Sequence, residues 1–284
     1  AGSTYMRMDV DGTERMRIAS DGKVFIGSTS SRALSGVNPQ MQIEGTDYST
    51  SSMSLIGNTG TDAGTAPLLM FGRSRGTSDG TSTAVASGDR LGAIFFTGAD
   101  GTDINTIGAY IEASVDGSVS GNTMPGRIQF YTNSGGSSAS EKMRITSGGN
   151  VGIGTTSPNI GGWHANYAVL TIKGDTTNYG GTLELANPES TGNYFGTISF
   201  VNMDGGSSAV ANARISGTRD GADDASALTF ETEPTGGSVT ERMRITSDGN
   251  VGIRETSPDS LLHISSVGDN SHCITMDQSG RKNA

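Results

Sequence analysis

The sequence is poor in cysteine, in long apolar runs and in helix signals, and each shortage excludes a class of protein. The single cysteine among 284 residues, Cys273, allows no internal disulfide. No apolar stretch approaches the roughly 18 residues of a membrane-spanning helix, so we expect no membrane insertion. No window keeps apolar residues at helical spacing without an interrupting glycine, which argues against an α-helical fold.

Apolar side chains are scarce as well. Hydrophobic residues make up 33% of the chain and the net charge is −10, a combination typical of disordered proteins. Several segments nevertheless alternate apolar and polar residues, which a disordered chain has no reason to keep. We therefore expect a thin core that partner chains must complete. The acidic balance argues against nucleic acid as a partner.

One motif occurs three times, beginning at Glu14, Glu141 and Glu241. Each copy reads Glu, a basic residue, Met-Arg-Ile, a glycine-containing turn and then Val-x-Ile. A long motif that recurs within one chain indicates an array of structural modules. Because Met16 and Ile18 alternate with arginines, the motif predicts a β-hairpin with one apolar face.

Parity decides the register of this hairpin. Pairing Ile18 with Val24 and Met16 with Ile26 keeps one face apolar, whereas a two-residue turn would mix the faces. This register requires a three-residue loop whose last position is left-handed, and Gly22 stands there, as glycine does in the other copies. The predicted core positions are Met16, Ile18, Val24, Ile26, Met143, Ile145, Val151, Ile153, Met243, Ile245, Val251 and Ile253.

Further strands recur around the hairpins and define the modules. Leu91–Phe96 aligns with Phe195–Phe200, and Met41–Gly45 aligns with Leu170–Gly174. Loops between these strands vary in length, as expected for exposed connections between buried strands. We expect the native chain to continue at both ends. The predicted organisation is the end of a preceding module at 1–31, complete modules at 32–158 and 159–258, and the truncated start of a third at 259–284.

The hairpin together with its tail Gly152–Pro158, Gly-Ile-Gly-Thr-Thr-Ser-Pro, resembles the repeat found along bacteriophage tail fibres and related virion appendages. The other two copies match less closely, since Ser31 stands where the others have proline and Arg254-Glu255 replace Gly-Thr. The resemblance implies homotrimers with elongated β-structured shafts and host-binding tips. Many such fibres carry a C-terminal self-cleaving chaperone domain, which nothing in this chain resembles.

The resulting fold prediction is all-β, with elongated tandem modules of antiparallel meanders, sandwich-like or prism-like, in an intertwined homotrimeric fibre shaft. The function that the resemblance implies is a structural shaft segment of a phage tail fibre that mediates host attachment. The implied partners are further copies of the chain, other virion tail or baseplate proteins and a host surface glycan, in an extracellular virion. A bacterial cell-surface adhesin of similar architecture is the alternative, followed by a glycan-degrading tailspike.

Only one loop concentrates aromatic and polar side chains, at Trp163, His164 and Tyr167. Rings with flat apolar faces and polar edges suit stacking on sugars, so these residues are the predicted glycan contacts. The competing interpretation, which we favour, is that Trp163 fills the junction between two modules just after Pro158.

The densest acidic cluster invites a catalytic or calcium-binding interpretation. We favour a solvated Asp-Gly turn and the outward face of a strand, because no stretch has the spacing of an EF-hand. The three histidines lie far apart and there is one cysteine, so a zinc site is not expected. We therefore predict no catalytic residue, no metal site, no cofactor and no enzymatic activity. The cluster comprises Asp220, Asp223, Asp224, Glu231 and Glu233.

Overall fold

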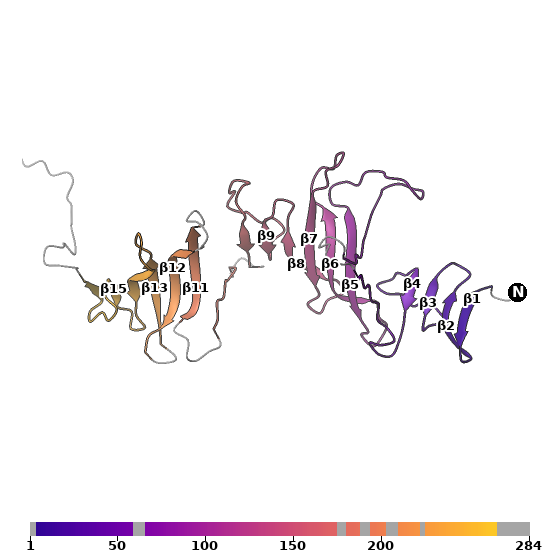
Figure 1. Ribbon diagram of the computed structural model, residues 1–284, viewed down its shortest axis with the longest axis horizontal. Helices are drawn as coiled ribbons and strands as arrows, with labels where there is room; N and C mark the ends of the chain where they lie inside the picture. The colour runs from indigo at the N-terminus through magenta and orange to yellow at the C-terminus, as the bar shows by residue number, and fades with distance from the viewer. Residues whose placement is uncertain are drawn as a thin grey trace, which may run out of the picture. The chain divides into compact units, whose positions relative to one another are not determined.

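The computed structural model describes residues 4–58, 66–174, 180–187, 194–202, 210–221 and 225–265. Within these ranges the protein is all-β, as predicted, with strands arranged in three sheets (Figure 1). The described residues contain no helix that is long and apolar enough to cross a membrane. Two compact units divide the chain, Ala1–Thr182 with the first two sheets and Leu183–Ala284 with the third.

The first sheet has four strands in the order β1-β2-β3-β4. Three antiparallel strands come first and a parallel strand follows. The bounds are β1 Met6–Val10, β2 Thr13–Ile18, β3 Val24–Ile26 and β4 Met41–Ile43.

The second and third sheets have six strands each and share one topology. In each, four long antiparallel strands lead into the short strand of the repeated hairpin, and a parallel strand closes the sheet. The second sheet comprises β5 Arg90–Gly98, β6 Thr106–Val115, β7 Gly126–Thr132, β8 Ser140–Ile145, β9 Val151–Ile153 and β10 Leu170–Ile172. The third comprises β11 Tyr194–Asn202, β12 Val210–Arg219, β13 Ser226–Thr232, β14 Thr240–Ile245, β15 Val251–Ile253 and β16 Leu262–Ile264.

The repeated hairpin has the predicted register in all three copies. Ile18 pairs with Val24 and Met16 with Ile26, and the corresponding pairs recur in the other two sheets. The Gly22 amide donates to the Ala19 carbonyl at 2.9 Å, which closes a three-residue loop. The last loop residue is a left-handed glycine each time, with φ of 81° at Gly22, 80° at Gly149 and 83° at Gly249.

The strand after each hairpin pairs with it in parallel, which the alternation of residues along the sequence does not predict. β3 pairs with β4, β9 with β10 and β15 with β16. The connections 27–40, 154–169 and 254–261 therefore return the chain to the starting end of the preceding strand. Each sheet thus extends beyond the position, 31, 158 or 258, at which the sequence suggested a module boundary.

A β-bulge in the first strand of each hairpin changes which face its glutamate occupies. Met16 lies opposite Met8 and Glu14 opposite Asp9, so Arg15 is an extra residue; Lys142 and Arg242 are the extra residues in the other copies. Regular alternation would place the glutamate beside the apolar side chains. The bulge places it beside the arginine three residues later, and the two form a bidentate ion pair. The Nη2–Oε2 distances are 2.7 Å for Arg17–Glu14, 2.7 Å for Arg144–Glu141 and 2.8 Å for Arg244–Glu241.

The Gly-Ile-Gly-Thr-Thr-Ser-Pro tail folds back over its own hairpin. A Cβ at Gly152 would lie 2.7 Å from the carbonyl oxygen of Thr155, so the tail needs glycine there. Gly154 has a φ of 70°, and a Cβ on it would lie 2.1 Å from the carbonyl oxygen of Lys173. The two glycines of the motif are therefore explained by close approaches of backbone atoms.

Candidate functional site

Each sheet presents one continuous apolar face built from paired rows of side chains. In the second sheet the rows run across all six strands, because apolar residues pair with apolar residues at every step. One row comprises Ile94, Ile111, Phe130, Met143, Ile153 and Ile172. The matching row of the third sheet comprises Ile198, Ile215, Phe230, Met243, Ile253 and Ile264. In the first sheet it comprises Met8, Met16, Ile26 and Ile43.

These apolar faces are open in the single chain. The exposed fraction is 46% for Ile128 and 45% for Ile94 in the second sheet, and 41% for Leu228 in the third. The twelve predicted core residues all lie on these faces, and every one is half-buried or exposed. One chain therefore gathers the predicted core positions on its sheets but leaves them incompletely covered.

Two extended segments outside the strands enlarge the apolar surface. Phe71 packs against Gly92 at the edge of the second sheet, where a Cβ on the glycine would lie 2.6 Å from the Phe71 Cβ. Leu185 packs in the same way against Gly196 at the edge of the third sheet. The signal in the sequence was a short apolar segment before the first long strand, the run Leu68–Phe71 in one module and the alternating Leu183 and Leu185 in the other.

The opposite face of each large sheet is polar, and the side chains at its centre are buried within the chain. Ser114 and Gln129 have exposed fractions of 0% and 3%, and Ser216 and Thr229 have 0% and 1%. Hydrogen bonds satisfy these side chains, as burial requires. The Ser114 hydroxyl, for example, donates to Glu112 at 2.6 Å. The usual arrangement, with the apolar side inside and the polar side in water, is thus reversed.

Three aromatic rings stack across neighbouring strands on the polar face of the second sheet. The ring centroids of Phe95 on β5 and Tyr110 on β6 are 4.9 Å apart, and those of Tyr110 and Tyr131 on β7 are 4.1 Å apart. Burial and the nearby Glu141 carboxylate raise the pKa of Tyr131 to about 12, and burial with Glu112 raises the pKa of Tyr110. Spacing along the sequence does not predict this stack. The equivalent positions of the third sheet hold Ser199, Arg214 and Glu231 instead.

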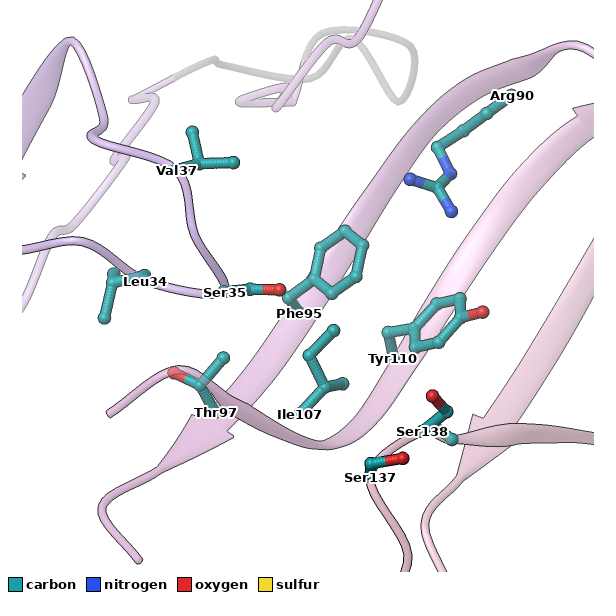
Figure 2. Close-up of a pocket in the computed structure, with 11 residues that line it drawn as sticks. Leu34, Ser35, Val37, Arg90, Phe95, Thr97, Ile107, Tyr110, Ser137 and Ser138 are labelled. Atoms are coloured by element: carbon teal, nitrogen blue, oxygen red, sulfur yellow. The ribbon is translucent and has the colours of Figure 1, made fainter. Parts of the chain in front are cut away.

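The stack borders a cavity of about 580 Å³. Figure 2 shows Phe95 between Tyr110 on one side and Leu34, Ser35 and Val37 on the other. Volumes of this size are within the range of small-molecule sites.

An arginine borders the same cavity. The guanidinium carbon of Arg90 lies 5.4 Å from the centroid of the Phe95 ring, and its Nε donates to Glu112 Oε2 at 2.7 Å. No residue in the described part of the chain accepts a hydrogen bond from the terminal nitrogens of Arg90. The cavity is therefore bordered by an aromatic ring and by an arginine whose terminal N–H groups have no acceptor among the described residues.

The loop predicted to contact glycan is exposed on the first unit. Trp163 and Tyr167 are 62% and 59% exposed, and their rings meet edge to face with centroids 6.0 Å apart. Asn159 holds the loop by two hydrogen bonds of 2.8 Å with the backbone of Trp163. His164 lies in the same loop and accepts a hydrogen bond from the Asn166 amide at 3.2 Å. The three predicted contact residues are therefore close together.

The acidic cluster is only partly within the described residues, since Asp223 and Asp224 lie outside them. Asp220 accepts hydrogen bonds from the amide and hydroxyl of Ser247 at 2.7 and 2.9 Å, which lower its pKa and hold the tip of the repeated hairpin. Glu231 is buried opposite Arg214, and Glu233 accepts from Asn212 at 2.7 Å. These three carboxylates thus make structural contacts. The described residues hold no group of His, Cys, Asp and Glu suited to a metal ion.

No family model matches the chain. A search of curated proteins likewise finds no match. Among solved structures, the carboxy-terminal domain of the bacteriophage T5 L-shaped tail fibre is 14% identical, with a TM-score of 0.29, covering 79% of this chain and all of the other. The same domain with its intramolecular chaperone domain is 14% identical, with a TM-score of 0.32, covering 81% of this chain and 71% of the other. TM-scores this low do not establish a shared fold.

Proposed function

We propose that this chain is a shaft segment of a bacteriophage tail fibre, in which three copies bury their apolar sheet faces against one another. The role is structural and adhesive, on an extracellular virion, with other tail or baseplate proteins as neighbours and a host surface glycan as target. The observation that carries the proposal is the reversed burial of the sheets. The resemblance of the repeated hairpin and its tail to tail-fibre repeats supports the assignment to a virion.

The exposed apolar faces require a partner surface that is also apolar and that recurs at each of the three sheets. Each apolar side chain that leaves water contributes about 1.5–3 kcal/mol when it becomes fully buried. Exposed apolar rows on all three sheets are a liability in a monomer and mark an interaction surface. A further copy of the chain supplies matching rows at every sheet. Three copies around one axis let each face contact two others, which is the closed symmetry that the resemblance implies.

The oligomeric mass tests the proposal directly. We expect the purified chain to elute with about three times the 29.1 kDa of one chain at micromolar concentration. Ile128→Glu places a charge in the centre of the apolar face and should shift the population to monomers or unfolded chains. If the face were an ordinary monomer surface, the same change at a 46% exposed position would cost under about 0.5 kcal/mol.

Leu261→Glu is the matched control, because Leu261 is 80% exposed and lies just outside β16. It should leave both the mass and the melting temperature unchanged. A stable folded monomer of the unmodified chain would overturn the trimeric proposal, and so would equal effects of the two substitutions.

The proposed role is non-enzymatic. Asp220, Glu231 and Glu233 make the structural contacts described above, which supports the shaft interpretation over a glycan-degrading tailspike. Incubation with host polysaccharide tests this point, since shortened chains would favour the tailspike. A bacterial adhesin of the same architecture would share the apolar faces, and a membrane anchor encoded in the same gene would favour it.

A further inference from the structure

The aromatic stack on the second sheet ends in an unused ring face. Tyr131 is at one end of the stack, where its hydroxyl lies 3.4 Å from Glu141 on the neighbouring strand β8. Phe95 is at the other end, on the edge strand β5, and its exposed fraction is 40%. Because no further strand follows β5 in this sheet, the outer side of the Phe95 ring borders the cavity (Figure 2).

A rigid turn from the first sheet forms the opposite wall of the cavity. Leu34 and Val37 exchange two backbone hydrogen bonds of 2.9 and 3.0 Å, with Ser35 and Gly36 at the tip. Ser35 and Gly36 have φ of 51° and 74°, the left-handed conformation that a two-residue hairpin turn requires at both central positions. The Gly36 amide donates to the Asn105 side chain at 3.1 Å, which anchors the turn to the loop between β5 and β6.

Polar groups surround the space between these two apolar walls. The hydroxyls of Ser35, Ser137 and Ser138 border it, and Arg90 lies beside the rings. Flat apolar walls with a polar rim match a pyranose sugar, whose C–H faces pack on aromatic rings while its hydroxyls form hydrogen bonds at the edge. Glu112 offsets the charge of Arg90 and the chain is acidic overall, which disfavours a polyphosphate ligand.

We propose that this cavity binds a single pyranose unit of a glycan, stacked on Phe95 and held between that ring and the Leu34–Val37 turn. The site lies on the polar face of the second sheet, so burial of the apolar face in an assembly leaves it accessible. The attachment role proposed above is the premise for a host glycan as the natural ligand. The third sheet has Ser199 in place of Phe95 and so lacks the ring wall.

Saturation-transfer NMR on the full chain tests the site, with the methyl glycosides of glucose, galactose, mannose and glucuronic acid as probes. We expect at least one probe to bind with a millimolar dissociation constant. A stronger signal from the glucuronide would show that the free donors of Arg90 take a carboxylate, whereas equal signals would indicate recognition of the ring alone. Absence of binding by all four sugars would overturn the proposal.

Three variants locate the binding. Phe95→Ala removes the ring wall and should weaken binding about tenfold, the equivalent of about 1.4 kcal/mol. Val37→Trp fills the cavity from the other side without changing the stacked rings and should abolish the signal. Trp163→Ala removes the competing candidate and should leave binding unchanged. Loss of binding in Trp163→Ala alone would assign the sugar to the Trp163 loop and defeat the cavity proposal.

The same samples separate this proposal from the trimeric one. A mass of three chains without sugar binding would reject only the cavity site. Sugar binding by a stable monomer would reject only the assembly. Unchanged melting temperatures in the three variants show that a lost signal does not come from unfolding.

Discussion

The second and third sheets have the same topology and the same registers, yet their polar faces differ. Both place isoleucine opposite isoleucine at the start of the main apolar row, and both carry the bulged hairpin with its glutamate–arginine pair. On the other face, Phe95, Tyr110 and Tyr131 of the second sheet correspond to Ser199, Arg214 and Glu231 of the third.

The comparison distinguishes, within one module, an apolar face that recurs from a polar face that varies. The apolar face and the hairpin are common to all three sheets, as expected if they serve an assembly that must be repeated along the chain. The polar face differs between the two sheets, which is allowed if only the apolar face has to match a partner. On its polar face the second sheet has an aromatic stack and a cavity, and the third sheet has an ion pair between Arg214 and Glu231.

The largest effect of a substitution on stability is expected at the residue that follows the hairpin. Gly154→Ala adds a Cβ 2.1 Å from the Lys173 carbonyl oxygen at a left-handed position. We expect a loss of about 3 kcal/mol, combining the left-handed penalty with overpacking against backbone. Urea unfolding at one protein concentration measures it.

Gly149→Ala is the matched control for Gly154→Ala. Gly149 has a φ of 80°, but a Cβ there would meet nothing within 4 Å. It should cost only about 1 kcal/mol, from the left-handed conformation alone. If the two variants lost the same free energy of unfolding, the close approach of Lys173 would make no contribution to the cost of Gly154→Ala.

The third sheet carries Arg254 at the position equivalent to Gly154, with a φ of 57°. Its amide still donates to the carbonyl of the bulged residue Arg242 at 2.9 Å, so the backbone path is kept despite the strain. Arg254→Gly should stabilise the protein by about 1 kcal/mol, because glycine adopts this conformation without a Cβ penalty. A lower urea midpoint for the variant would contradict this explanation.

The smallest effect is a local response to alkaline pH that only the second sheet should show. The raised pKa of Tyr131 means that the folded state favours the neutral phenol. Its contribution is therefore complete below the ordinary value of 10.0 and is lost as the pH rises towards about 12. Isoleucine methyl NMR should show Ile111 and Ile128 leaving their native shifts before Ile198 and Ile215.

Tyr131→Phe tests the cause of the alkaline response, because it removes the phenol whose pKa is raised to about 12 and keeps most of the stacked ring. The difference in pH between the changes of the second-sheet and third-sheet methyl signals should then narrow, with Tyr110 as the remaining phenol of raised pKa in the stack. If Ile111 and Ile128 still leave their native shifts at the same pH in this variant, the alkaline response arises from another group of the second sheet.

Local patterns in the sequence determined the hairpins, because strand parity and turn chemistry act over a few residues. The pairing of Met16 with Ile26, the left-handed Gly22 and the alignment of the long strands followed from alternation and repetition alone. The same alternation identified the side chains that form the apolar face, and the scarcity of apolar residues indicated that one chain does not complete their burial.

Only the tertiary structure decided features that depend on distant backbone. The bulge at Arg15 moves Glu14 to the opposite face from the one that regular alternation assigns, because an extra residue breaks the period of two. The parallel strand β4 pairs with β3 only because the connection between them turns back. The rings of Phe95, Tyr110 and Tyr131 come together through the registers of three strands, which no spacing along the sequence reveals.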